Sequence, residues 1–151
     1  MVQLVQQSLS QWNIKVESYE IPDSYCPGRY DLVVDGLKIG GIAQRRFKTG
    51  ITTAAYISVN GNQDARAELI RDYYLIGQAD ETYPKVNPNV MTTLEKVIGE
   101  AITVSDYQRY LLEVFKRFST VEVGDFNQAD LEGFYQQSFP KVFQRTLSVQ
   151  P

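Results

Sequence analysis

The dipeptide Asp35-Gly36 is the feature that most restricts how this chain can fold. It separates the apolar stretch YDLVV from the stretch LKIGGIAQRRF. Both central residues of a type I′ turn need positive φ, and Asp-Gly is a preferred pair for this turn. The two stretches are therefore predicted to pair as an antiparallel hairpin, with Val34 opposite Leu37 and Val33 opposite Lys38.

Further segments enlarge this hairpin into an α+β domain. IKVESYE before it and ITTAAYISV after it have strand composition, which gives a sheet of about four strands, antiparallel or mixed. Apolar residues at three- and four-residue spacing predict helices in 2–12, 64–77, 88–99, 106–118 and 128–139. We expect one domain over 1–151, with the first helix, a loop and the sheet in 1–61. Residues 62–151 should be mainly helical, with helices packed on one face of the sheet.

Composition excludes several classes of function. A net charge of −3 and a pI near 5.0 argue against nucleic acid or an anionic membrane as the main partner. No window reaches the roughly 18 apolar residues of a membrane span, and the first residues do not resemble a signal peptide. A single cysteine cannot form an internal disulfide, so we expect a cytoplasmic protein.

The absence of histidine restricts the chemistry further. It removes Cys-His and Ser-His pairs together with the commonest metal ligand, so we expect no metal site and no metal cofactor. The only cysteine, Cys26, lies in the turn-rich stretch PDSYCPG, whereas a core cysteine belongs on the apolar face of a strand or helix. Reactive groups concentrate in such loops. Cys26 is therefore a candidate nucleophile.

A thiol needs a nearby positive charge to become a thiolate at neutral pH. Lys38 is the most versatile candidate among the nearby cations, because a lysine can also donate a hydrogen bond to an acyl oxygen or transfer a proton. A straight continuation of the hairpin would place Cys26 opposite Arg45, about 20 Å from Lys38 at ~3.3 Å per residue. Direct contact requires the turn at 26–28 to fold the loop back over the sheet. The other cations considered are Arg29, Arg45, Arg46 and Lys48.

Gly40 and Gly41 lie within the second strand of the hairpin. Two glycines in a strand can mark a bulge or tight packing. They can also clear space for a ligand, and a long acyl chain would suit such a groove. No Gly-rich turn leads into a helix, so a phosphate loop is excluded.

The segment SYCPGRYDLVVDGLKIGGIAQRR resembles the biotin/lipoate protein ligase superfamily, and most closely its octanoyl- and lipoyl-transferring amidotransferases. The resemblance lies in the YCPG-YDL segment, the hairpin lysine and the Gly-Ile-Ala-Gln-Arg-Arg strand. It implies a biotin/lipoate ligase-like fold in which Cys26 takes the acyl group as a thioester and Lys38 activates the thiol. The substrate-binding residues it implies are Gly40, Gly41, Ile42 and Ala43.

The resemblance also implies the partners. These are H-type carrier proteins of the glycine-cleavage system and lipoyl domains, between whose lysines an octanoyl or lipoyl group moves without ATP or a cofactor. This chain resembles only the carboxy-terminal half of the family, which is about twice as long. We therefore expect a truncated, processed or split enzyme that needs a complementary amino-terminal half or a homodimer. Nucleic acid and membrane are not expected partners.

Two alternatives remain open. One is an ATP-dependent lipoate-protein ligase, in which Lys38 polarises an acyl adenylate and Cys26 is incidental. The other is a non-catalytic half that docks a lipoyl domain or completes a partner subunit. Loss of activity in Lys38→Ala but not in Cys26→Ala would favour the ligase.

Overall fold

A computed structural model describes residues 1–48, 50–77, 82–83, 85–122, 124 and 128–147. The chain divides into two units, Met1–Ser119 and Thr120–Pro151. The first unit contains the sheet and all of the described helices but one. The second contains a single described helix, α5 (Gln128–Leu147).

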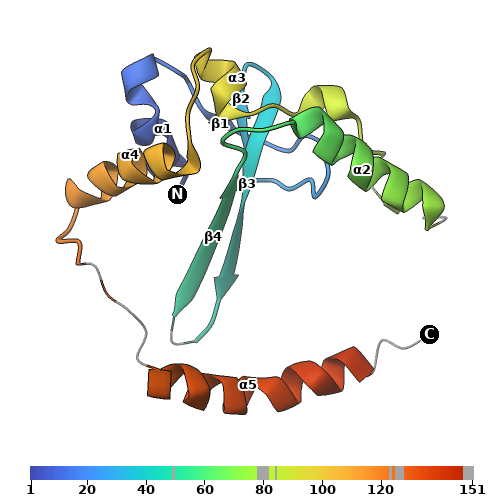
Figure 1. Cartoon of the computed structure of the whole chain (residues 1–151), viewed down its shortest axis with the longest axis vertical. Coiled ribbons are helices and arrows are strands. Elements are labelled where there is room, and N and C mark those ends of the chain that lie inside the picture. Colours follow the sequence, from blue (N-terminus) through green and yellow to red (C-terminus); the bar gives the residue numbers. More distant parts are fainter. Residues whose placement is uncertain (49, 78–81, 84, 123, 125–127, 148–151) are drawn as a thin grey trace. The chain divides into compact units, whose positions relative to one another are not determined.

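The sheet in the first unit is a four-stranded antiparallel meander (Figure 1). Its strands lie in the order β1 (Glu17–Ser18), β2 (Asp31–Val34), β3 (Leu37–Arg46) and β4 (Ile51–Ile57). The α+β class predicted from the sequence is confirmed. Asp35 and Gly36 have φ of 48° and 79°, and Val33 pairs with Lys38, as the Asp-Gly turn predicted.

A register shift interrupts the pairing of β2 with β3. Leu32 pairs with Gly40 rather than with Ile39, so Ile39 is an extra residue on β3, as in a β-bulge. Side chains alternate along a regular strand, so Ile39 and Ile42, three residues apart, would normally face opposite sides of the sheet. The bulge shifts this alternation by one residue, and both side chains lie on the core side. It also puts Gly41 opposite Asp31, on the same face as Lys38.

Helices cover the core face of this sheet. They are α1 (Val2–Ser8), the 3-10 turn η1 (Ser10–Trp12), α3 (Leu94–Ile98) and α4 (Val104–Lys116), which enclose one apolar cluster together with the strands. A smaller cluster lies under α2 (Gln63–Ile76), around Ala67, Val86 and Met91. The main cluster consists of Val5, Leu9, Val16, Leu32, Val34, Ile39, Val59, Leu94, Ile102 and Tyr107.

The prediction of a single helix over 88–99 is wrong. It is split into the 3-10 turn η2 (Pro88–Val90), capped by Asn87, and α3, capped by Thr93. Between them Met91 forms a parallel bridge with Lys38, and the Thr92 N–H donates to the Lys38 carbonyl at 2.9 Å. These bonds to β3 replace the helical ones, which ends one helix and begins the next.

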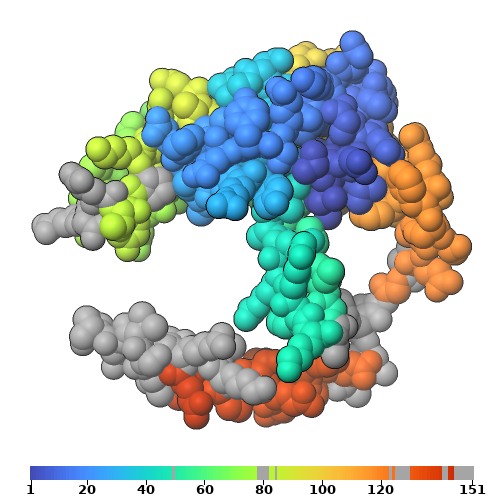
Figure 2. Space-filling model, turned by 180° about the vertical axis from the view of Figure 1, so that it is seen from behind, coloured from blue at the N-terminus to red at the C-terminus, as the bar shows by residue number. Residues whose placement is uncertain are grey.

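The outer part of the hairpin is exposed. From Ala43 to Arg46 every residue of β3 is exposed, and most of β4 is exposed as well. Figure 2 shows this part of β3 and β4 projecting beyond the rest of the first unit. Within the described residues β4 is an edge strand, because its only partner is β3. No described helix is both long and apolar enough to cross a membrane.

Candidate active site

Cys26 lies in an ordered loop between β1 and β2. The loop is tied down by bonds from the Ser24 N–H and hydroxyl to the Ile21 carbonyl, at 3.0 and 2.8 Å, and from the Asn87 N–H to the Asp23 carbonyl at 2.7 Å. The Cys26 side chain is exposed. Its φ is 49°, although a residue that precedes a proline favours extended backbone. A non-glycine residue held in this region stores strain, which is common at functional sites.

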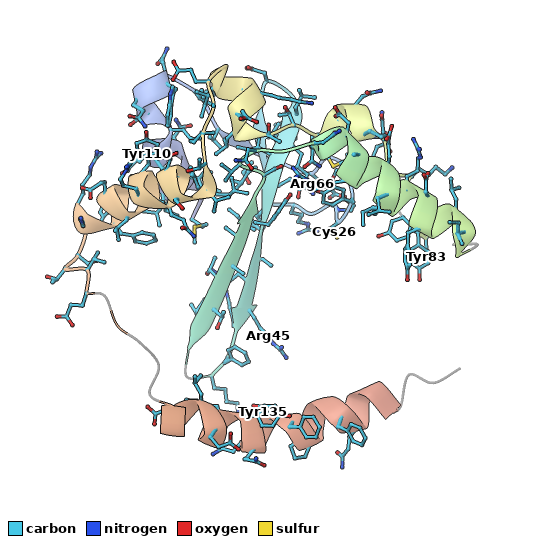
Figure 3. The ribbon with its side chains drawn as sticks, in the orientation of Figure 1. Cys26, Arg45, Arg66, Tyr83, Tyr110 and Tyr135 are labelled. Carbon is cyan, nitrogen blue, oxygen red and sulfur yellow. The ribbon has the colours of Figure 1, made fainter. Side chains whose placement is uncertain are left out.

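Lys38 is buried on β3 beneath this loop. Its ammonium nitrogen donates to the carbonyl oxygens of Cys26 and Tyr25, at 2.9 and 3.1 Å, and to the Ser24 hydroxyl at 3.0 Å. The loop therefore folds back over the sheet, as a contact between Cys26 and Lys38 requires. Figure 3 shows the labelled Cys26 in this loop.

Asp31 is the buried counter-ion of Lys38. Its Oδ1 lies 3.0 Å from the Lys38 ammonium, and its Oδ2 accepts from the Ile21 N–H at 3.1 Å. From the sequence, Asp31 is expected only to make local turn hydrogen bonds, as aspartates near a hairpin usually do. The predicted pairing of Val33 with Lys38 could have revealed the contact between Asp31 and Lys38. It makes Asp31 a diagonal cross-strand neighbour of Lys38 on the same face, within reach of a long side chain.

A second polar network joins the loop to α2. Gln63, almost fully buried, donates from Nε2 to the Tyr25 hydroxyl at 2.9 Å and accepts from the Ser58 hydroxyl at 2.8 Å. Arg66 donates to the same Gln63 oxygen and to Ser58. Burial, together with the hydrogen bond between the hydroxyls of Tyr25 and Tyr56, raises the pKa of the Tyr25 phenol. Tyr25 is thus a neutral anchor for the residue next to Cys26.

A small cavity of about 10 Å³ lies between this network and Lys38, with room for about one water. Its lining includes Lys38, Gly40, Tyr25, Tyr56 and Met91.

The four residues expected to bind substrate have different surroundings. Gly40 borders the cavity, whereas Gly41 faces Asp31 and Lys38. Ile42 packs against the main core, and Ala43 is exposed further along β3.

The site offers an exposed thiol next to a buried ion pair. In the parts of the chain that the structure describes, no three His, Cys, Asp or Glu side chains are grouped as metal ligands. The chemistry that these residues can perform is attack by the Cys26 sulfur on a carbonyl carbon. The Lys38–Asp31 pair fixes the backbone around that sulfur.

Comparison with known proteins identifies relatives with acyl-transfer names. Residues 1–116 match the family model of the lipoyl protein ligase A/B catalytic domain. Octanoyl-[GcvH]:protein N-octanoyltransferase of Oceanobacillus iheyensis is 41% identical over 123 residues, which cover 79% of this chain and 44% of that protein. Lipoyl-[GcvH]:protein N-lipoyltransferase of Listeria monocytogenes is 34% identical over 152 residues, covering 98% of this chain and 53% of that protein.

The chain thus spans about half the length of the curated relatives it matches. A third relative, octanoyl-[GcvH]:protein N-octanoyltransferase of Geobacillus kaustophilus, is 35% identical and is covered over 53% of its length. The family model covers most of this chain, from α1 to the end of α4. The chain therefore belongs to the lipoyl protein ligase A/B catalytic domain family.

Proposed function

We propose that this chain supplies the nucleophile of an acyltransferase of lipoate metabolism. An octanoyl or lipoyl group would move from a lysine of an H-type carrier protein to the sulfur of Cys26, and then to a lysine of a lipoyl domain. The names of the relatives support this choice of substrates and partners. The observation that carries the proposal is the exposed Cys26, held at φ 49° with its carbonyl bonded to the buried Lys38.

The two half-reactions balance without ATP, metal or another cofactor. The Cys26 sulfur attacks the amide carbonyl of the acylated carrier, the C–N bond breaks, and the departing lysine takes up the proton that the thiol gives up. An acceptor lysine then attacks the thioester, the C–S bond breaks, and its proton returns to the sulfur. A covalent intermediate of this kind divides one difficult transfer into two easier steps.

Lys38 would act here as a fixed hydrogen-bond donor. Four oxygen atoms lie within 3.1 Å of its nitrogen, whereas an ammonium group has three protons. This saturation holds the Cys26 backbone in place, and the positive charge lies next to the loop that carries the thiol. A neutral lysine that accepts protons would lose its ion pair with Asp31, so we assign Lys38 no role as a general base.

We also propose that a second chain completes the site, either the complementary amino-terminal half or a second copy of this chain. The unpaired edge of β4 within the described sheet supports this proposal. Leu69, Tyr73 and Ile76 point outward from α2 with 69%, 71% and 83% of their surfaces exposed. An exposed apolar face of this kind marks an interaction surface.

We also propose a cytoplasmic location for the protein, because a reactive thiol such as that of Cys26 fits a reducing compartment.

Intact-mass spectrometry tests the proposed acyl transfer. The chain is incubated with an octanoylated H-type carrier protein, alone and together with the amino-terminal half of a relative. We expect one octanoyl group per chain, removed by hydroxylamine because it is a thioester. Peptide mapping should place this group on Cys26.

Cys26→Ala is the matched control and should remain unmodified. A mass gain that persists in Cys26→Ala would contradict the proposed nucleophile. No mass gain in the completed two-part enzyme would contradict the transfer itself. Adenylate formation that needs Lys38 but not Cys26 would favour an ATP-dependent ligase instead.

A further inference from the structure

A cysteine-bound acyl group on this protein would lie next to an amine of the same chain. The Lys38 nitrogen is 2.9 Å from the carbonyl oxygen of Cys26, so it is close to the residue that would carry the thioester. Amines attack thioesters, and the acceptor lysine of the proposed reaction does so in its second step. An unprotected Lys38 would therefore compete with the acceptor for the acyl group.

This competing reaction would inactivate the site. The lone pair of the Lys38 nitrogen would attack the thioester carbonyl, the C–S bond would break and a C–N bond would form. The proton lost by nitrogen would pass to the departing cysteine sulfur. The product is an amide inside the protein, and the Cys26 thiol is regenerated next to a lysine that has lost its charge.

Asp31 provides a means of preventing this reaction. Its carboxylate is 2% exposed, and it contacts the Lys38 ammonium at 3.0 Å. The other three oxygens around the nitrogen are neutral and come from Ser24, Tyr25 and Cys26. Only the carboxylate favours the ammonium by charge, and an ammonium has no lone pair with which to attack.

We propose that Asp31 protects the acyl-enzyme by holding Lys38 as an ammonium, which prevents transfer of the acyl group from Cys26 to Lys38. Asp31 is in this sense a positioning residue that acts through Lys38. The proposal rests on the proposed function, because it presupposes an acyl thioester on Cys26. It adds a reason for a buried carboxylate at a site that would otherwise need only positive charge.

A small acyl donor allows a test on this chain as it exists. Octanoyl-N-acetylcysteamine acylates exposed thiols by thioester exchange, and Cys26 is the only cysteine and is exposed. The wild type and Asp31→Asn are acylated, freed of reagent and incubated for increasing times. Samples are then treated with hydroxylamine, which removes thioesters and leaves amides, and the remaining label is located by peptide mapping.

In the wild type we expect the label to stay on Cys26 until hydrolysis, with no octanoyl amide on Lys38. In Asp31→Asn the opposite charge that contacts the Lys38 nitrogen is lost. Hydroxylamine-resistant label on Lys38 should then rise about tenfold or more over the wild type. Asp31→Glu keeps the charge and should behave as the wild type. The double variant Asp31→Asn/Lys38→Arg should carry no resistant label at this position.

Two results would overturn the proposal. One is a wild-type protein in which amide forms on Lys38 as fast as the thioester hydrolyses, a result that needs no variant to fold. The other is an Asp31→Asn protein that keeps its circular dichroism and its cooperative unfolding and still shows no amide on Lys38. Failure of the carrier-protein experiment alone would reject the proposed donor, whereas either of these two results rejects the protective role of Asp31.

Discussion

At the scale of single residues, the backbone of Cys26 is held in an unfavourable conformation. Its φ of 49° belongs to the left-handed region, which costs a residue with a β-carbon about 1–2 kcal/mol and costs glycine little. We therefore expect Cys26→Gly to be more stable than Cys26→Ala by about 1 kcal/mol. Urea denaturation of the two variants measures this difference in the free energy of unfolding.

Glu113 supplies the matched control for this prediction. It lies in the interior of α4, where glycine is less favourable than alanine by about 1 kcal/mol. Glu113→Gly should therefore be less stable than Glu113→Ala, the opposite order. If both positions favoured alanine, Cys26 would not be strained in solution.

Gly40 and Gly41 predict a contrast between neighbouring residues. A β-carbon on Gly40 would overlap the carbonyl oxygen of Tyr56 on β4, and this backbone cannot easily move. A β-carbon on Gly41 would meet Asp31 Oδ1 at 3.4 Å, which is close to ordinary contact. We expect Gly40→Ala to lower the free energy of unfolding by about 3 kcal/mol or more, and Gly41→Ala to change it by less than about 1.5 kcal/mol.

Thermal unfolding of the two alanine variants, in parallel with the wild type, measures this contrast. Equal destabilisation by both substitutions would contradict the close approach of β3 and β4 at Gly40. The contrast also separates the two interpretations of the glycine pair. Tight packing accounts for Gly40, whereas Gly41 faces the Asp31–Lys38 pair.

The sequence predicted part of the candidate site and missed another part. Cys26 and Lys38 could be chosen because reactive thiols need a nearby cation and this chain has no histidine. Asp31 could not be chosen from residue type alone, because its partner depends on the register of β2 against β3. Gln63 was missed as well, because a glutamine at the start of a helix gives no sign that it will be buried against Tyr25.

At the scale of secondary-structure elements, α4 shows how local signals can fix a helix terminus. The Thr103 hydroxyl accepts from the Asp106 N–H at 3.1 Å, and the Asp106 carboxylate accepts from the Thr103 N–H at 3.1 Å, which is a capping box. Thr103 lies three residues before the helix expected over 106–118. The two bonds are local, so the four residues from 103 to 106 suffice to predict them.

The capping box makes the stability of the fold depend on pH, and the direction follows from the pKa of Asp106. The hydrogen bonds from Thr103, assisted by Arg109, lower the pKa of Asp106 below its ordinary value of 3.8. A carboxylate whose pKa is lower in the folded state stabilises the fold above the unfolded-state value, and this stabilisation is lost as the pH falls through the folded-state value. The wild type should therefore have a larger free energy of unfolding than Asp106→Asn. This difference should reach its full value near pH 6 and shrink below about pH 4.

Urea denaturation between pH 3 and pH 6 measures this difference. Glu113→Gln makes the same change of charge on the same helix and corrects for the effect of net charge. A difference between the wild type and Asp106→Asn that stays constant down to pH 3 would contradict the capping role of the carboxylate.

Elements determined by distant contacts were harder to predict than α4. The pattern over 88–99 fits one helix, yet the bonds of Met91 and Thr92 to β3 divide it in two. The expected strand IKVESYE is reduced to Glu17–Ser18, the part that pairs with Leu32 and Val33. The helix expected over 128–139 continues to Leu147 through Pro140. Its rings at 135, 139 and 143 stack at four-residue spacing on both sides of that proline.

At the scale of the whole molecule, most of the apolar stripe of α2 has no cover within the described residues. Leu69, Tyr73 and Ile76 are spaced to lie along one side of the helix, and each is at least 69% exposed. Exposed apolar stripes of this kind mark interaction surfaces, which supports the second chain proposed above as the occupant of this one.

We therefore expect this chain to form an assembly larger than its monomer mass of 17.2 kDa. Size-exclusion chromatography with light scattering measures the mass, for the chain alone and after mixing with the amino-terminal half of a relative. Leu69→Asp places a charge in the stripe and should shift the mass toward the monomer, because burying an unpaired charge is costly. Arg71→Gln makes the same change of net charge on a different side of α2 and should leave the assembly intact. A monomer under both conditions, or equal loss of assembly in both variants, would contradict burial of this stripe by a second chain.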